Sequence, residues 1–293
     1  MYYFYYLIIK ALSCIPFGVL YVLSDMMYYP LYYVVRYRRK IVRKNLTESF
    51  PDKSLGEIIA IEKKFYHYFV DLIFESCKLA TISEEEIMRR MKFVNPEVLD
   101  NAFADGKSIV TFIGHYGNWE WLTSVGLWLK SDAQRVQVYH KLSNEAVDKL
   151  MLNLRERLGN VCVEMHKTAR FVSSATTEGT QFLLALIADQ TPRKKDAKYY
   201  LSFLNHTVPV ILGPEKITKH YDLFPVFVNI KRLKRGYYEF NVSPMHENPT
   251  ELPDYQLSDI YFKRLEEEIL AQPECYLWSH NRFRLALNNQ PVS

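Results

Sequence analysis

The spacing of apolar residues divides the chain into an N-terminal apolar segment, a helical region and a longer region of short apolar runs. From Tyr2 to Ser24 the only charged residue is Lys10. A helix over this stretch would be about 35 Å long, which is enough to cross a hydrocarbon core of about 30 Å. Residues 54–80 then repeat apolar side chains at spacings of three and four, which predicts a long helix.

From residue 108 onward, short β-branched and apolar runs alternate with helical patterns. Such runs are typical of buried strands. We predict strands over residues 108–113, 136–140, 161–165, 182–188, 225–230 and 237–242, the last two as a hairpin. We predict helices over residues 118–130, 144–158, 213–221 and 257–270. Strands that alternate with helices predict an α/β domain with a mixed, largely parallel sheet flanked by helices.

The N-terminal segment is predicted to be a membrane-anchor helix within residues 1–35, followed by one globular domain over residues 36–293. Six basic residues fall within positions 36–44, directly after the apolar segment. This order predicts that the following domain lies on the cytoplasmic side of the membrane. Pro16 and the many tyrosines leave an in-plane or re-entrant helix as an alternative. A cleaved signal peptide fits less well, because neither a basic start nor a small-residue cleavage site is evident.

Composition narrows the class of protein further. The chain has 293 residues, of which 48% are hydrophobic and 24% charged, and this excludes a disordered or collagen-like protein. The net charge of +4 is too small to indicate a nucleic-acid-binding protein. The four cysteines lie too far apart for a local zinc or redox motif, so we expect buried thiols in a reducing compartment rather than disulfides. The histidines show no ligand spacing, so we expect neither a metal nor a cofactor.

The most informative stretch is GHYGNWE, residues 114–120, between a predicted strand and a predicted helix. If His115 lies on the connecting loop, Glu120 in the first helical turn can fold back toward its ring. A carboxylate on one imidazole nitrogen fixes the tautomer and raises the basicity of the other nitrogen. The helix start adds free backbone N–H groups for a developing oxyanion. The stretch predicts a general base; the alternative is a structural histidine beside a glutamate that merely favours a helix start.

HYGNWE in this setting resembles the HxxxxE block of the lipid A biosynthesis acyltransferases, within the wider group of glycerolipid and lysophospholipid acyltransferases. Three further stretches are similar in order: YRRKIVRKNLTESFP (37–51), ADQ (188–190) and QPECYLWSHNRF (272–283). After the ADQ block the chain departs from the family, because FLN stands where the family has an FFG-type stretch. This departure weakens any transfer of acyl-chain length or acceptor identity.

The resemblance implies an acyltransferase of glycerolipid acyltransferase-like fold at the bacterial inner membrane, with its catalytic domain facing the cytoplasm. It would move a fatty acyl chain from a thioester, usually on acyl carrier protein, to a hydroxyl of lipid A or its precursor. His115 would deprotonate the hydroxyl and Glu120 would orient His115, with Asn118 and nearby N–H groups as oxyanion donors. The residues leave open coenzyme A as the donor, a lysophospholipid, aminolipid or other glycolipid as the acceptor, and a non-catalytic lipid-binding protein.

Further residues are candidates for binding substrate. Asp189 ends a predicted strand, where ligands of α/β proteins gather, although a capping role is an equal alternative. Lys141, Arg155 and Arg193 are candidates to bind phosphate groups of the lipid or of the acyl carrier prosthetic group. For each of these basic residues, the alternative is a solvated surface charge.

Overall fold

The computed structural model describes residues 2–287, and its N-terminal region forms two helices where one was expected. α1 (Tyr2–Cys14) and α2 (Phe17–Tyr29), which continues into the π-helix η1 (Pro30–Val35), meet at a bend of 118°. Pro16 explains the break, because proline has no backbone N–H and its ring clashes with the preceding turn. Among the described helices none is by itself long and apolar enough to cross a membrane. The bent pair taken together has the length and the apolar composition that a crossing requires. The prediction of one continuous helix is therefore wrong, whereas the role of this segment as an anchor stays a prediction.

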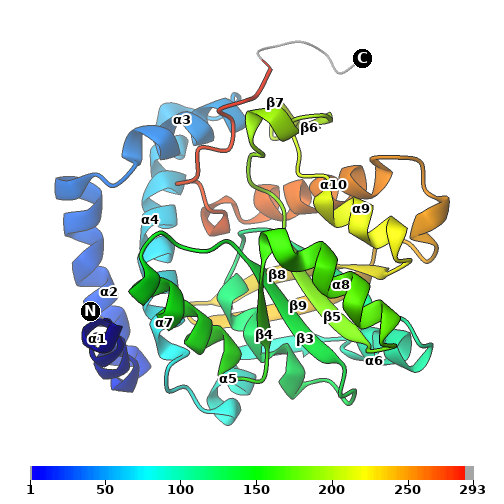
Figure 1. Ribbon diagram of the computed structural model, residues 1–293. Coiled ribbons are helices and arrows are strands. Elements are labelled where there is room, and N and C mark those ends of the chain that lie inside the picture. Colours follow the sequence, from blue (N-terminus) through cyan, green and yellow to red (C-terminus); the bar gives the residue numbers. More distant parts are fainter. Residues whose placement is uncertain (1, 288–293) are drawn as a thin grey trace.

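The bent pair packs along α4 (Leu55–Lys78), the long helix expected over residues 54–80. α4 starts at a capping box in which Ser54 and Glu57 exchange hydrogen bonds. Figure 1 shows α1 and α2 on the side of α4 that faces away from the sheet. Several of their apolar side chains are exposed, among them Tyr3, Leu7, Val22 and Met26. The N-terminal pair thus presents an apolar outer surface.

Some basic residues that follow this pair make contacts inside the protein. Arg39 and Arg43 of α3 (Arg39–Ser49) donate to the carboxylate of Glu62, which is fully buried on α4. Arg38 donates to the backbone oxygen of Ser279 at 3.0 Å. The others in the cluster, Arg36, Lys40 and Lys44, are exposed. The basic cluster therefore serves the fold as well as the surface.

Seven strands form the central sheet: β1 (Met91–Val94), β2 (Ile109–Ile113), β3 (Gln134–Tyr139), β4 (Val161–Glu164), β5 (Phe182–Ile187), β8 (Phe224–Lys234) and β9 (Tyr237–Pro244). Their order is β1-β9-β8-β2-β5-β3-β4. Every neighbouring pair is parallel except the β8–β9 hairpin. This confirms the predicted α/β class with a mixed, largely parallel sheet. The strand β1 was not predicted, because four residues carry too little pattern.

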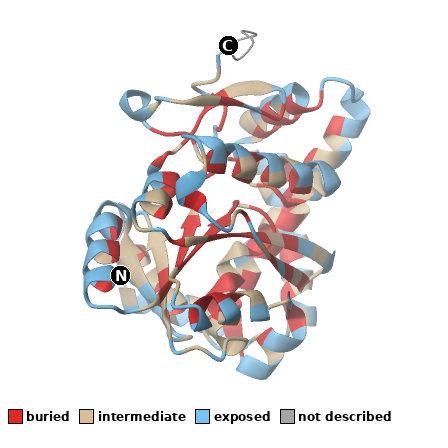
Figure 2. Ribbon diagram, turned by 90° about the vertical axis from the view of Figure 1, so that its right-hand side faces the viewer, coloured by how far each residue is buried: buried red, intermediate tan, exposed pale blue. Residues whose placement is uncertain are grey.

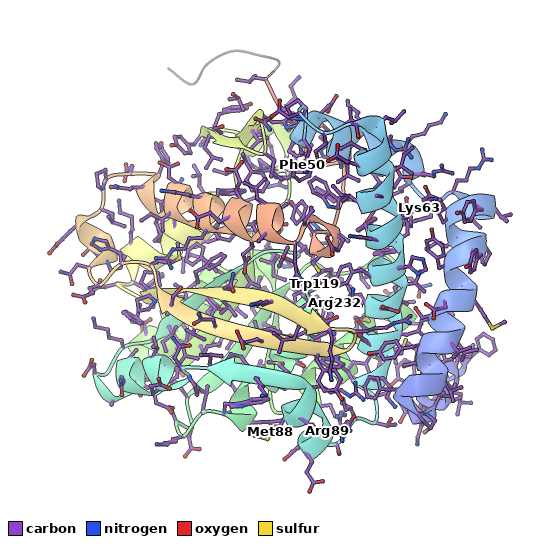
Figure 3. The ribbon with its side chains drawn as sticks, turned by 180° about the vertical axis from the view of Figure 1, so that it is seen from behind. Phe50, Lys63, Met88, Arg89, Trp119 and Arg232 are labelled. Carbon is purple, nitrogen blue, oxygen red and sulfur yellow. The ribbon has the colours of Figure 1, made fainter. Side chains whose placement is uncertain are left out.

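Helices flank the sheet, and burial concentrates in the strands and the helix faces turned toward them (Figure 2). α6 packs against β2 and β9, α7 and α8 against β4, and α10 against β8. α5 turns Arg90 inward, whereas Met88 and Arg89 project from its outer side (Figure 3). The bounds are α5 (Glu84–Arg90), α6 (Glu97–Ala104), α7 (Glu145–Glu156), α8 (Thr168–Thr177), α9 (Gly213–His220) and α10 (Gln256–Ala271).

The remaining elements are short. A separate antiparallel hairpin, β6 (Tyr200–Phe203) and β7 (His206–Pro209), contacts α10 and was not predicted. The 3₁₀ helices are η2 (Trp119–Leu127), η3 (Met165–Lys167), η4 (Lys194–Asp196), η5 (Pro249–Glu251) and η6 (Pro273–Cys275). η6 packs against α4 and α10 and leads into the C-terminal stretch. All four cysteines are free thiols, as expected, but the predicted burial holds only for Cys275; Cys77 and Cys162 are half-buried and Cys14 is exposed.

Candidate active site

Strand register brings a histidine and an aspartate together at one edge of the sheet. Strands β2 and β5 are parallel neighbours, and Ile113 pairs with Ile187. His115 and Asp189 each follow these paired residues by two positions, so both leave the sheet at the same level. The Nδ1 atom of His115 lies 2.6 Å from Oδ1 of Asp189. The pair is held by the geometry of two adjacent buried strands.

The contact with Asp189 determines what the other nitrogen of the ring can do. In the tautomer whose Nδ1 carries the hydrogen, Nδ1 donates to Asp189 and the unprotonated Nε2 accepts a hydrogen bond from the side-chain amide of Gln190. Nε2 lies 3.3 Å from the side-chain nitrogen of Gln190. The ring of Trp119 packs edge-on against the imidazole, with centroids 5.3 Å apart. His115 is therefore oriented on two sides and presents a basic nitrogen.

Asp189 is buried, with 1% of its surface exposed. Burial acts to raise the pKa of its carboxyl group. The charge that His115 carries when protonated, hydrogen bonds from the His115 side chain and backbone, and the Arg282 guanidinium outweigh that effect and leave the pKa of Asp189 below its ordinary value. Asp189 is thus a carboxylate at neutral pH, suited to stabilising a protonated imidazole.

Glu120 does not hold the place that the sequence suggested. Its carboxylate is bound by both sides of the Arg155 guanidinium, at 2.6 and 3.0 Å. Successive side chains of a 3₁₀ helix point about 120° apart. Because Trp119 at the start of η2 faces His115, the next side chain turns away toward α7. The carboxylate that contacts His115 is therefore Asp189 and not the expected Glu120. Arg155, which was expected to bind phosphate, is paired with Glu120.

Asn118 is also used inside the protein. It is fully buried; its Nδ2 donates to Glu75 at 2.8 Å, and its Oδ1 accepts from the backbone N–H of Trp121 at 3.3 Å. The side chain therefore caps η2, which differs from the expected contact with an oxyanion. The preceding Gly117 has φ +56°, and a Cβ there would lie 2.3 Å from a methyl group of Ile230. The loop thus has a conformation and a packing that only glycine fits.

The other two basic candidates lie on the surface. Lys141 follows β3 by two residues and is exposed. Arg193 is exposed and pairs with Asp196 at 2.6 Å. Neither has a contact with His115 or Asp189 among the described hydrogen bonds and ion pairs. Their roles in binding stay predictions.

Residues of the C-terminal block 272–283 contact the segment that follows Asp189. The backbone N–H of Thr191 donates to His280 at 3.4 Å, and the Thr191 hydroxyl donates to the backbone oxygen of Arg282 at 2.5 Å. Burial, more than any other effect, lowers the pKa of His280 to about 4, so its ring is neutral at physiological pH. Gln190 and Arg282 were not predicted as site residues. The available signals were the place of Gln190 directly after Asp189 in the ADQ block and the place of Arg282 in the C-terminal block.

These features define an α/β protein whose histidine–carboxylate pair lies at the carboxyl edge of parallel strands. The chain belongs to the bacterial lipid A biosynthesis acyltransferase family, whose model matches residues 1–285. A comparison with curated proteins finds no significant match. Within residues 2–287, no group of three or more His, Cys, Asp or Glu side chains is placed to hold a metal ion.

The pairing of Glu120 with Arg155 leads to a prediction about stability. Glu120→Gln is expected to lower the free energy of unfolding by about 2–3 kcal/mol, because it leaves the largely buried Arg155 without its counter-charge. The matched control is Asp196→Asn in the exposed Arg193 pair, expected to cost less than about 1 kcal/mol. Urea unfolding followed by circular dichroism measures both. Equal losses for the two variants would contradict a structural role of the Glu120–Arg155 pair.

Proposed function

We propose that this protein transfers a fatty acyl chain from an acyl thioester to a hydroxyl group of lipid A or its precursor, with His115 as the general base. The observation that carries the proposal is the 2.6 Å contact between His115 Nδ1 and buried Asp189. It leaves Nε2 as the proton acceptor, in a chain that belongs to an acyltransferase family. The fold alone would support many activities; the histidine–carboxylate pair narrows them.

In the proposed reaction, His115 Nε2 removes the proton of the acceptor hydroxyl as its oxygen attacks the thioester carbonyl. Asp189 stabilises the positive imidazole that results. When the intermediate collapses, the carbon–sulfur bond breaks and the proton on Nε2 passes to the departing thiolate. The products are an ester and a free thiol, and His115 returns to its starting state. No oxidant, reductant or further reactant is required.

The transfer is proposed to be direct, without a covalent acyl-enzyme. A thioester is already activated, so that one base and one oxyanion site suffice for attack by a hydroxyl. The block 114–120 contains no Ser or Cys that His115 would activate. Because the Asn118 side chain is engaged, the backbone N–H groups at the start of η2 are the proposed oxyanion donors. Lys141 and Arg193 remain proposed contacts for phosphate groups of donor or acceptor.

The roles of the two carboxylates differ from each other in this proposal. Asp189 orients His115 and stabilises its charge, whereas Glu120 holds Arg155 and through it fixes η2 against α7. Glu120 would therefore act on catalysis through the position of the loop. This assignment replaces the direct His115–Glu120 contact expected from the spacing of the motif.

The N-terminal pair is the proposed membrane-binding part, with the catalytic domain at the cytoplasmic face of the inner membrane. Its exposed apolar side chains support this, for example Tyr3 with 77% and Val34 with 78% of the surface exposed. An exposed apolar surface of this kind favours burial in a bilayer interface. Acyl carrier protein is the proposed donor, and it would approach the same edge of the sheet from the aqueous side.

Acyl transfer can be tested with purified protein, radiolabelled acyl carrier protein thioester and a lipid A precursor. Label is expected to move to the lipid, and His115→Ala is expected to abolish the transfer. Without acceptor, no stoichiometric label should remain on the denatured protein, because transfer is direct. Label on the protein that depends on His115 would overturn the direct mechanism. Mass spectrometry of total lipids with and without the gene product identifies the acceptor, and a modified phospholipid or other glycolipid would replace lipid A.

Asp189→Asn is expected to lower kcat by about 10²–10⁴-fold with little change in KM, because a neutral amide does not stabilise the imidazolium and favours the wrong tautomer. The matched control is Asp148→Asn, which alters another buried aspartate, one that accepts a backbone N–H at 2.7 Å. Steady-state kinetics on both variants measure the difference. A near-normal kcat in Asp189→Asn would remove Asp189 from the proposed mechanism.

Membrane binding is expected to resist salt and alkaline carbonate and to yield to detergent, because apolar burial in the bilayer does not depend on charge screening. Fractionation of cells that express the full-length protein, followed by immunoblotting, measures this. A peripheral protein bound only through Lys40 and Lys44 would be released by high salt. Release by carbonate alone would therefore contradict a membrane-embedded N-terminal pair.

A further inference from the structure

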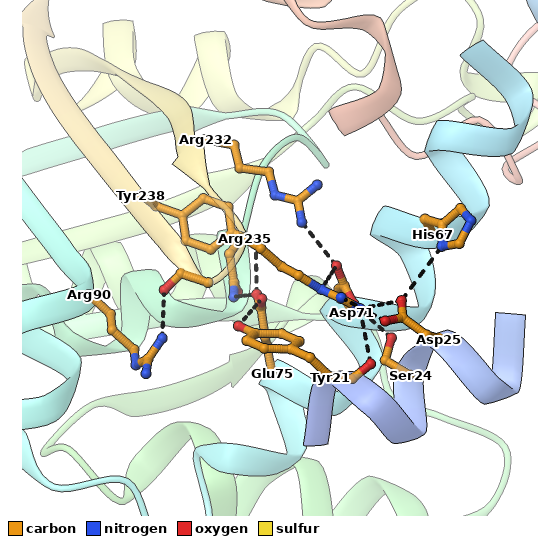
Figure 4. A network of polar contacts seen from close by, with 12 residues as sticks. Tyr21, Ser24, Asp25, His67, Asp71, Glu75, Arg90, Arg232, Arg235 and Tyr238 are labelled. Atoms are coloured by element: carbon orange, nitrogen blue, oxygen red, sulfur yellow. Dashed lines mark hydrogen bonds and ion pairs between the residues drawn. The ribbon is translucent and has the colours of Figure 1, made fainter. Parts of the chain in front are cut away.

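A second buried carboxylate, Glu75 of α4, joins three separate parts of the protein. It has no exposed surface. Its Oε1 accepts a hydrogen bond from the hydroxyl of Tyr21 on α2 at 2.9 Å. Its Oε2 accepts from Asn118 at 2.8 Å and from the hydroxyl of Tyr238 on β9 at 2.8 Å. Asn118 belongs to the loop of residues 114–118 between β2 and η2, which carries His115 and is called the site loop below. Figure 4 shows this carboxylate between the N-terminal helix and the hairpin of β8 and β9.

All three partners of Glu75 donate hydrogen bonds to it, so that the loss of any one of them leaves a buried acceptor with fewer donors. Burial, with the negative charge of Asp71, raises the pKa of Glu75 to about 7, while Tyr238, Arg232 and Tyr21 act to lower it. A buried acceptor that loses a donor keeps the cost of its desolvation, and water has no access to replace the donor. The position of Glu75 and the positions of its three donors are therefore tied to one another.

The site loop is bound tightly enough to follow Glu75. Asn118 bridges Glu75 and the backbone N–H of Trp121, and the indole N–H of Trp121 donates to the backbone oxygen of Glu75 at 3.1 Å. The backbone oxygen of Gly117 accepts a hydrogen bond from the Tyr68 hydroxyl, also on α4. A shift of Glu75 thus displaces residues 117–121. His115 lies on the same short loop, two residues before Gly117.

On the opposite side, α2 is attached to the same network. Tyr21 donates to Glu75, and the Arg235 guanidinium lies over the Tyr21 ring at 4.5 Å. Ser24, one turn further along α2, donates to Asp71 at 2.7 Å and has no contact with the site loop among the described hydrogen bonds. The two residues attach one helix to two carboxylates of α4, but only Tyr21 reaches the carboxylate that holds Asn118.

We propose that Glu75 is a positioning residue of the site, and that the seating of α2 through Tyr21 sets the geometry of the His115 loop. The proposal rests on the acyl transfer assigned to this site above. Its consequence is that the apolar N-terminal pair does more than attach the protein to a membrane. A change in how the pair is seated changes the rate of the chemical step.

The test compares two variants of the full-length protein that each remove one oxygen from α2: Tyr21→Phe and Ser24→Ala. Tyr21→Phe keeps the ring that stacks on Arg235. It is expected to lower kcat by about 10–100-fold, since a displacement of about 1 Å at a reacting group costs up to about 10²-fold. KM should stay within about twofold, because substrate binding is not the affected step. Ser24→Ala should change kcat by less than about threefold, although it also removes a buried hydrogen bond.

Two further measurements separate positioning from a general loss of structure. Hydrogen exchange of the amides of residues 114–122 should become faster in Tyr21→Phe and not in Ser24→Ala, whether or not the protein transfers acyl groups. In steady-state kinetics, the double variant Tyr21→Phe/Glu75→Gln should have the same kcat as Glu75→Gln alone, because both substitutions act on one network.

Each outcome gives a decision. Equal exchange in the two single variants, or an unchanged kcat in Tyr21→Phe, would overturn the positioning role. Faster loop exchange in Tyr21→Phe, in a protein whose wild-type form transfers no acyl group, would support the attachment of the loop to α2 and refute the proposed function. Faster exchange together with a lower kcat would support both.

Discussion

Three buried carboxylates on one helix organise the N-terminal half of this protein. Glu62, Asp71 and Glu75 of α4 are each at most 2% exposed. A buried carboxylate is costly unless donors surround it, so each recruits partners from elsewhere in the chain. Glu62 binds α3 and η1, Asp71 binds α2, Arg232 of β8 and Arg235 of the following turn, and Glu75 binds α2, the site loop and β9. The buried carboxylates of α4 thus connect the N-terminal pair to the sheet.

The positions of the candidate site residues depend on α4 on one side and on the sheet on the other. Register between β2 and β5 sets the distance from His115 to Asp189, because both residues follow paired positions. Helix α4 fixes the position of the loop that carries His115 through two hydrogen bonds, one between Tyr68 and Gly117 and one between Glu75 and Asn118. A general base needs both: the carboxylate fixes its tautomer and the loop fixes its direction. The family of acyltransferases to which the chain belongs gives this arrangement its proposed chemistry.

Much of the fold was predictable from the spacing of residues. The strands after residue 108 are short β-branched and apolar runs, and the helices between them repeat apolar residues at spacings of three and four. Both patterns reflect the burial that a sheet covered by helices imposes. The elements that were not predicted are those in which few residues carry a pattern, such as Met91–Val94 and the hairpin at Tyr200–Pro209. Pro16 indicated an in-plane or re-entrant helix as an alternative, but the observed arrangement, two helices at 118°, depends on how both pack on α4.

The residue types of the site were evident in the sequence, whereas their pairing was not. The sequence by itself determined that a histidine follows a buried strand, that a glycine-rich loop and a helix start surround it, and that Asp189 ends another strand. It suggested Glu120 as the partner because that residue is close along the chain. Only the tertiary structure decided between the two carboxylates: adjacent strands bring Asp189, 74 positions away, to 2.6 Å, and the 3₁₀ turn directs Glu120 to Arg155. The physical reason is that a hydrogen bond depends on distance and direction in space, and sheet register sets these independently of separation along the chain.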